Sequence, residues 1–313
     1  MNMNNSIPYL SNAELASLDI STSEVVACIE TLLRNLDKSV WTAPKSVILP
    51  EDGRYLMATL SAANEPNILA VKSLVLNPTN PERGFQQING LVTLLDSDTG
   101  LPLAILDANW ITAVRTAGLS ATAAKYMANQ ESQIAAFIGC GVQAASHLQA
   151  FSDLFPLKEI RLFGRGQENI DKMCDDAKRR GLVVNVYDSG NEAMAAADLV
   201  VSSVTYASDL RPFLNADCLK PGAFAAVTDL AAPWDKSSLG LLDRVVIDDL
   251  QQEAALPNKL LSPSDISGDL AGLVMSEFDG RVTQSDRTAF VFRGHAIGDL
   301  ALSILAYQKL SLG

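Results

Sequence analysis

The 313-residue sequence is poor in histidine and cysteine, the most frequent zinc ligands, with two histidines and four widely separated cysteines. Cys28, Cys140, Cys174 and Cys218 show none of the paired spacings of common zinc sites and do not suggest a disulfide framework. No apolar run approaches the length of a membrane span. Residues 1–6 lack a basic region and an apolar core, so we expect no signal peptide and a reducing, cytoplasmic setting.

Positive charge is also scarce, because 24 Lys and Arg residues face 36 Asp and Glu residues and the formal net charge is −12. This balance argues against nucleic acids and anionic membranes as partners. The 48% hydrophobic and 19% charged residues are an ordinary globular composition that can bury a large core. The length suits one large domain or two modest ones.

A glycine-rich turn organises the second half of the sequence. An apolar run over residues 134–138 leads into Gly-Cys-Gly-Val-Gln-Ala at residues 139–144, a G-x-G-x-x-A pattern before a helix-forming segment. In dinucleotide-binding folds the glycines allow a tight turn and a close approach to pyrophosphate, which the helix N-terminus then binds. A tight turn without a ligand can show the same pattern. We predict cofactor contacts at Gly139, Gly141, Val142, Gln143 and Ala144.

The residues after the next predicted strand, 157–163, bear on the choice of cofactor. An Asp or Glu at the end of that strand would bind a ribose 2′-hydroxyl and select NAD. The sequence has Gly164-Arg165-Gly166 instead, and an arginine can pair with a 2′-phosphate. We therefore predict NADPH, with Arg165 as the selecting residue and NADH less favoured. A solvated surface arginine is the alternative interpretation.

The pattern of apolar runs predicts two domains. Short runs separated by turn signals over residues 46–106 predict a mostly antiparallel sheet. Alternating strands and helices over residues 134–248 predict a parallel sheet covered on both faces. We predict an α/β fold in which a Rossmann dinucleotide-binding domain, residues 119–289, is inserted in an α+β domain of residues 1–118 plus 290–313.

Three basic residues lie in apolar surroundings in the first part of the chain. Lys45 follows Pro44, Lys72 lies within an apolar strand-like run, and Arg115 lies in an alanine-rich segment. A lysine inside an apolar strand is costly unless it is paired or faces a cleft. Each residue alone could be an edge or snorkelling side chain. Together they could form a site for a substrate carboxylate.

Four segments, residues 90–107, 111–121, 138–144 and 292–301, resemble the ornithine cyclodeaminase/mu-crystallin family. The T-x-x-R-T-A stretch around Arg115 and the G-x-G-x-Q-A turn are specific in combination, and the resemblance covers nearly the whole chain. It implies a homodimer whose N-terminal domain, completed by the C-terminal helix, binds substrate and dimerises. It also implies that the Rossmann domain binds a nicotinamide cofactor, with small amino or imino acids as substrates.

The resemblance implies roles for single residues. Lys72 and Arg115 match the family's Lys and Arg that hold the substrate carboxylate, and Lys45 matches a position that is more often Arg. Lysine there offers a point charge instead of a fork. Gly294 and His295 would lie near the nicotinamide.

The sequence positions of three further residues suggest roles for them. Thr205, after a predicted strand, is a candidate cofactor contact or a plain turn residue. Asp299 is interpreted first as a carboxylate favoured by the dipole of the last helix, and His147 as structural.

One position separates the chemistries within the family. Cyclodeaminases carry an Asp in a G-G-D-x-P-G-K segment, and counting without gaps from Pro221-Gly222 places Ala231 there. Alanine cannot act as an acid or base, although a gap would bring Asp229 into that place. Members without this Asp resemble reductases of cyclic imines that carry a carboxylate.

The predicted function is NADPH-dependent reduction of Δ1-pyrroline-2-carboxylate or Δ1-piperideine-2-carboxylate to proline or pipecolate. Lys45, Lys72 and Arg115 would bind the carboxylate and orient the imine. Lys72 and Asp229 are the catalytic candidates, with Asp229 stabilising or protonating the iminium unless it is only a turn residue. The alternatives are an ornithine or lysine cyclodeaminase with bound NAD, an amino-acid dehydrogenase such as alanine dehydrogenase, and a non-catalytic NADPH-binding protein of the mu-crystallin kind.

Overall fold

A computed structural model describes residues 6–205 and 210–312 as two compact units. Unit 1 comprises Met1–Arg115 and His295–Gly313, and unit 2 comprises Thr116–Gly294. Residues 1–5, on which the signal-peptide prediction mostly rests, lie outside the described part. The predicted domain boundaries at 118/119 and 289/290 fall inside helix α3 (Ala108–Met127) and strand β14 (Thr288–Val291), respectively.

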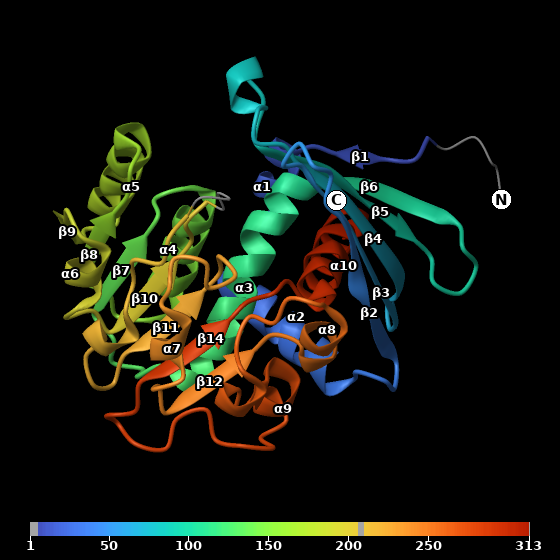
Figure 1. Ribbon diagram of the computed structural model, residues 1–313. Helices are drawn as coiled ribbons and strands as arrows, with labels where there is room; N and C mark the ends of the chain where they lie inside the picture. Colours follow the sequence, from blue (N-terminus) through green and yellow to red (C-terminus); the bar gives the residue numbers. More distant parts are fainter. Residues whose placement is uncertain (1–5, 206–209, 313) are drawn as a thin grey trace. The chain divides into compact units, whose positions relative to one another are not determined.

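Unit 1 is built on a six-stranded sheet with the order β1-β6-β5-β4-β3-β2 (Figure 1). Neighbouring strands are antiparallel except the pair β1 and β6, which confirms the mostly antiparallel sheet predicted from the sequence. The strands are β1 (Tyr9–Leu10), β2 (Val40–Ile48), β3 (Tyr55–Asn64), β4 (Asn67–Leu76), β5 (Ile88–Leu95) and β6 (Pro102–Asp107).

The edge strand β2 is longer than predicted and contains a β-bulge. Ala43 pairs with Leu60 and Ser46 pairs with Ala58, so two residues of β2, Pro44 and Lys45, stand opposite one residue of β3. The prediction that this strand begins at residue 46 is wrong, because the proline sits in a bulge of an edge strand and does not end it.

Helices cover one face of this sheet. Helix α10 (Ala296–Leu312) packs on β2, β3 and β4, and it also packs against α2 (Thr22–Arg34). Helices α1 (Asn12–Ser17) and α2 each begin with a Ser/Glu capping box. A 3₁₀ turn, η1 (Pro81–Arg83), lies in the β4–β5 connection.

Unit 2 holds an eight-stranded sheet with the order β13-β12-β14-β11-β10-β7-β8-β9, in which every pair is parallel. This confirms the predicted parallel sheet. The inner strands are buried on both faces, as parallel sheets usually are. The strands are β7 (Ile134–Ile138), β8 (Glu159–Phe163), β9 (Val183–Val186), β10 (Leu199–Ser202), β11 (Phe224–Val227), β12 (Arg244–Ile247), β13 (Gly268–Asp269) and β14.

The helices of unit 2 connect these strands (Figure 1). Within the described ranges 6–205 and 210–312, no helix is both long enough and apolar enough to cross a membrane. The connecting helices are α4 (Val142–Leu154), α5 (Gln167–Arg179), α6 (Gly190–Met194), η2 (Ala216–Cys218), α7 (Lys236–Leu239), α8 (Leu250–Ala255), η3 (Pro263–Asp265) and α9 (Leu270–Val274).

Candidate active site

The glycine-rich turn joins β7 to α4 in unit 2. Gly139 has a φ of 95°, and a Cβ there would lie 2.7 Å from the carbonyl oxygen of Ser203. A Cβ at Gly141 would meet no atom within 4 Å, so this backbone borders open space. Gly141 is the N-cap of α4 and provides no side-chain cap. The first N–H groups of α4 can therefore bind a phosphate, which fits a dinucleotide.

The buried ring of His147 connects the first turn of α4 to α3. Its Nδ1 is 2.7 Å from the carbonyl oxygen of Gln143, and its Nε2 is 2.9 Å from the hydroxyl of Ser120 in α3. Burial lowers the pKa of His147 to about 4, so the ring is neutral near pH 7. Because a carbonyl can only accept, Nδ1 carries the proton and Ser120 donates to Nε2. These contacts suit the structural role expected for His147.

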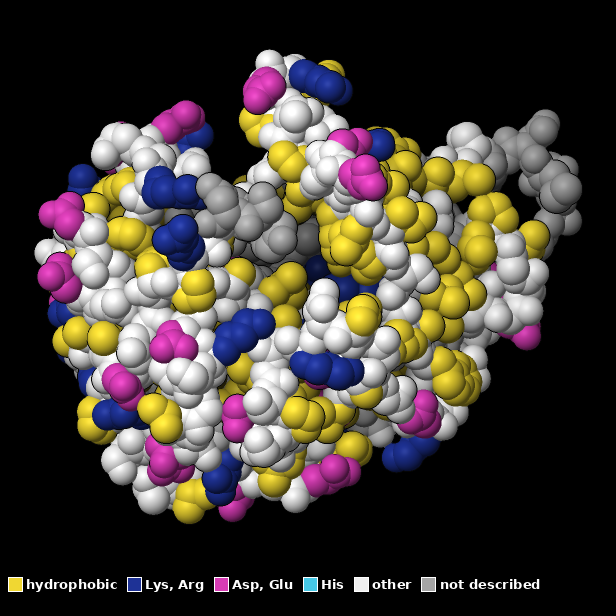
Figure 2. Space-filling view, in the orientation of Figure 1, with side chains coloured by type: hydrophobic (Ala, Val, Ile, Leu, Met, Phe, Trp, Pro, Cys, Tyr) yellow, Lys and Arg dark blue, Asp and Glu magenta, His cyan; other side chains and the backbone are white. Residues whose placement is uncertain are grey.

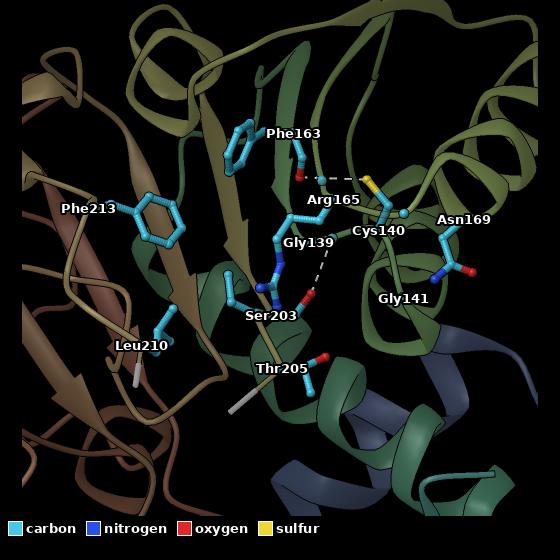
Figure 3. Close-up of a pocket in the computed structure, with 13 residues that line it drawn as sticks. Gly139, Cys140, Gly141, Phe163, Arg165, Asn169, Ser203, Thr205, Leu210 and Phe213 are labelled. Carbon is cyan, nitrogen blue, oxygen red and sulfur yellow. Dashed lines mark hydrogen bonds between the residues drawn. The ribbon is translucent and has the colours of Figure 1, made fainter. Parts of the chain in front are cut away.

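A pocket of about 440 Å³ lies where β7, β8 and β10 end (Figure 3). Gly139 and Gly141 line it together with Arg165 and Thr205, so the structure brings these four predicted cofactor residues together. Arg165 follows β8, and its side chain extends into the pocket in Figure 3. Carboxyl ends of parallel strands are where such folds bind their ligands.

The pocket is also lined by residues that no sequence motif indicated. The rings of Phe163 and Phe213 form an apolar wall with centroids 5.8 Å apart. Asn169, in the first turn of α5, also lines the pocket, and its side-chain nitrogen would lie 3.9 Å from a Cβ at Gly166. Phe213 could not be found from the sequence, because it lies outside the strand–helix pattern that marks the nucleotide site.

Gly294 and His295 do not line this pocket. Gly294 has a φ of 114°, its N–H donates to Asp248 Oδ2 at 2.5 Å, and its carbonyl accepts from the Gln252 amide at 3.2 Å. His295 Nδ1 accepts the N–H of Ile297 at 3.2 Å, in the first turn of α10. The buried Asp248 and Gln252 thus bind the backbone of Gly294, the last residue of unit 2. The sequence did not indicate this role for them.

In unit 1, Lys72 and Arg115 share one buried carboxylate. Lys72 Nζ is 2.7 Å from Asp299 Oδ1, and Arg115 Nε is 3.2 Å from the same oxygen. Thr59 is the cross-strand partner of Lys72, and its hydroxyl donates to Asp299 Oδ2 at 3.0 Å. The three charged side chains are at most 6% exposed. We call Lys72, Arg115, Asp299 and the nearby Lys45 the cation cluster.

Two sequence interpretations need correction here. An edge or snorkelling position for Lys72 is wrong, because β4 is an inner strand and the side chain is wholly buried. Asp299 does lie in the first turn of α10. A helix-dipole role alone is nevertheless incomplete, because its oxygens contact Lys72, Arg115 and Thr59.

The cation cluster carries more positive than negative charge. Burial lowers the pKa of Lys72 to about 8, and repulsion from Arg115 and Lys45 acts in the same direction, whereas Asp299 opposes them. Burial alone would raise the pKa of Asp299, but Lys72 and Arg115 outweigh it and hold that pKa below the usual value. Three cations around one carboxylate suit a ligand that brings a second carboxylate.

Asp229 lies in unit 2 just beyond the end of β11, where its side chain joins two strands. Oδ1 accepts the hydroxyl of Ser202 at 3.1 Å, and Oδ2 accepts the N–H of Val204 at 3.0 Å. The Trp234 indole in turn donates to Ser202 Oγ at 2.8 Å. Burial raises the pKa of Asp229 to about 7, although the hydrogen bonds act against it. Asp229 can therefore carry a proton near neutral pH, and it also steadies Val204 at the pocket.

The parallel sheet, the glycine-rich turn and the pocket at the strand ends define a nicotinamide-dinucleotide-binding Rossmann protein, whose second unit contains a buried cation cluster. The model of the ornithine cyclodeaminase/mu-crystallin family matches residues 9–313. The chain therefore belongs to the ornithine cyclodeaminase/mu-crystallin family, which confirms the resemblance that the four sequence segments indicated.

Known proteins similar to this chain include reductases and a dehydrogenase. The ketimine reductase mu-crystallin of Rattus norvegicus is 29% identical over 97% of this chain and 98% of the relative. The structure of Thermococcus litoralis Δ1-pyrroline-2-carboxylate reductase in complex with NADH and L-proline matches with a TM-score of 0.88 and 25% identity, covering 98% of each chain. An archaeal alanine dehydrogenase dimer with bound NAD matches with a TM-score of 0.85 and 25% identity, covering 98% of this chain and 97% of the other.

Proposed function

We propose that this chain is an NADPH-dependent reductase that converts Δ1-pyrroline-2-carboxylate, Δ1-piperideine-2-carboxylate or both to L-proline and L-pipecolate. The observation that carries the proposal is the cation cluster, because its surplus of buried positive charge suits a small substrate with a carboxylate. Similarity to a ketimine reductase and to a Δ1-pyrroline-2-carboxylate reductase supports the choice of cyclic imines.

Unit 1 would bind the substrate through its carboxylate. Arg115 supplies a planar fork and Lys72 a buried point charge. The β-bulge places Lys45 opposite Thr59, which is the cross-strand neighbour of Lys72, so Lys45 adds a third cation. Holding the carboxylate orients the C=N carbon, and this positioning is much of what a hydride transfer needs from a protein.

Unit 2 would bind NADPH, which supplies the hydride when bound. The open backbone at Gly141 and the N-terminus of α4 fit the pyrophosphate, and Arg165 fits the 2′-phosphate. NADH is the less favoured cofactor because no acidic residue follows β8 directly. The remaining proposed cofactor contacts are Gly139, Val142, Gln143, Ala144, Thr205, Gly294 and His295.

The imine nitrogen must gain a proton as the carbon accepts the hydride. Asp229 is the proposed donor, because its pKa of about 7 keeps a share of the carboxyl groups protonated near neutral pH. Lys72, with a pKa of about 8, is the second candidate. In the simpler alternative, Asp229 only ties Ser202 and Val204 to the end of β11.

The proposal includes a homodimer formed through unit 1. The face of the six-stranded sheet that points away from α10 is apolar and exposed. It includes Trp41, Leu60, Val75 and Leu91. Figure 2 shows hydrophobic side chains gathered over these strands, at the right of the view. Large exposed apolar faces mark interaction sites. A cytoplasmic location belongs to the same proposal and suits the four free cysteines.

An amino-acid dehydrogenase is the second candidate, favoured by the match to an archaeal alanine dehydrogenase. The two chemistries differ in their need for free ammonia. A dehydrogenase running in reverse must combine a 2-oxo acid with ammonia before reduction, whereas a cyclic imine already contains the C=N bond. The cation cluster would hold the carboxylate in both cases, so the structure favours neither through that group.

The test follows the consumption of NADPH with each imine offered separately and without added ammonia. NADH, pyruvate with ammonia, and ornithine serve as parallel substrates. Rapid NADPH consumption with an imine, and no ammonia from ornithine, is the expected result. Ammonia release from ornithine without imine turnover would indicate a cyclodeaminase. Turnover only with pyruvate and ammonia would indicate a dehydrogenase.

A further inference from the structure

Asp299 is held in the cation cluster from three directions. The first turn of α10 brings it over β3 and β4, 227 positions along the sequence from Lys72. One carboxylate oxygen faces Lys72 and Arg115, and the other accepts the hydroxyl of Thr59. With a side chain only 2% exposed, the carboxylate is fixed by these contacts and not by water.

We infer that Asp299 is a positioning residue that keeps the Lys72 ammonium charged and directed, so that Lys72 can bind the substrate carboxylate. This inference rests on the proposed function, in which Lys72 anchors the substrate. Asp299 itself is not proposed to touch the substrate.

The charges around Lys72 support this role. Arg115 from α3 and Lys45 from β2 both disfavour a charged Lys72, as does the removal of Lys72 from water. Asp299 from α10 is the group that opposes these three effects. A neutral Lys72 would lose the charge-assisted hydrogen bond that makes it a good carboxylate ligand. The ionised Asp299 therefore extends the pH range over which Lys72 can serve as a charged anchor.

Removal of the Asp299 charge should have little effect on carboxylate binding at low pH and a large effect at high pH. At low pH Lys72 stays protonated, and the cluster of Asp299→Asn is more positive, so a carboxylate still binds. At higher pH the same variant loses the Lys72 proton earlier than the wild type does. A residue with only a structural role would weaken binding by the same factor at every pH.

The experiment measures kcat/KM and KM for the preferred imine from about pH 6 to about pH 9. L-proline binding by calorimetry gives a second readout that does not depend on turnover. We expect the alkaline fall of L-proline affinity, near pH 8 in the wild type, to move down by about one pH unit or more in Asp299→Asn. The separate fall of kcat near pH 7, which is proposed for Asp229, should keep its position. At about pH 6 the variant should stay within about threefold of the wild type, and at about pH 8 it should fall about tenfold below.

Three comparison variants make the result specific. Asp299→Glu keeps the negative charge and should return the alkaline fall towards its wild-type position. Lys72→Met should lose substrate anchoring at every pH. Asp198→Asn removes a carboxylate that pairs with Lys220 in unit 2 and should leave the position of the alkaline fall unchanged.

Either of two results for Asp299→Asn would overturn the inference while the wild type remains active. One is an alkaline fall at the wild-type position. The other is an equal loss of imine and proline binding at every pH. If Asp299→Asn does not fold, Asp299→Glu decides the question. A shift of its alkaline fall by about one pH unit or more, although the negative charge is kept, would overturn the inference. A wild type inactive on both imines would instead overturn the proposed function, and the inference with it.

Discussion

Replacement of Arg165 by alanine tests the proposed choice of NADPH over NADH. The side chain extends into the unit 2 pocket from the loop after β8, where dinucleotide folds contact the adenosine ribose. NADPH and NADH differ only in the 2′-phosphate. Arg165→Ala should therefore weaken NADPH use and leave NADH use nearly unchanged.

The size of the effect follows from the exposure of Arg165. A hydrogen bond to a charged group contributes about 1.5–3 kcal/mol. Arg165 is exposed, so solvent screening places the expected value near the lower end, at about 1.5–2 kcal/mol. This corresponds to a loss of about ten- to thirtyfold in the ratio of kcat/KM for NADPH to that for NADH.

The assay measures kcat/KM for each cofactor with the imine held at saturation. Arg179→Ala is the matched control, because Arg179 is an exposed arginine at the other end of α5 that pairs with Asp176. The control should keep the wild-type cofactor ratio. An unchanged ratio in Arg165→Ala, or an equal loss with both cofactors, would refute the assignment of Arg165 to the 2′-phosphate.

Four further variants and one control test other parts of the account. Gly139→Ala should destabilise folding by at least about 1–2 kcal/mol, because φ is positive and a Cβ would press on Ser203. Gly141→Ala has room for a Cβ, so it should weaken NADPH binding without a similar loss in the free energy of unfolding. Equal unfolding free energies for the two glycine variants, measured by denaturant titration, would contradict this. If protonated Asp229 is the donor, the kcat of the wild type should fall as the pH rises through about 7. Asp229→Asn should be slower and should lack this fall. The same pH profile in both proteins would exclude Asp229 as the donor. Leu60→Asp should be monomeric in sedimentation experiments, whereas the control Leu241→Asp, at an exposed position in unit 2, should remain dimeric. A dimeric Leu60→Asp would exclude this face of the sheet as the dimer interface.

Features encoded by neighbouring residues were predictable from the sequence. The capping box at Ser11 and Glu14 depends on residues three apart, and the turn at Gly139 depends on the strand and helix beside it. Arg165 was found by counting from that turn to the end of the next strand. The cation cluster was predicted in part, because a lysine inside an apolar strand is unusual enough to indicate a shared site.

Features encoded by distant residues were not predictable. Asp299 meets Lys72 across 227 positions, and no local pattern connects them. Ser202 and Trp234 reach Asp229 by the same kind of tertiary contact. Strand β14 was missed because it lies between β11 and β12 in the sheet although it follows β13 in the sequence, and no local pattern shows that return.

The most direct test of hydride transfer to the imine uses NADPH that carries deuterium at the transferring position of the nicotinamide. The purified protein is given this cofactor and Δ1-pyrroline-2-carboxylate, and the proline formed is analysed by mass spectrometry. The account predicts L-proline with one deuterium at the α-carbon. Proline without deuterium, or no proline together with ammonia release from ornithine, would contradict it.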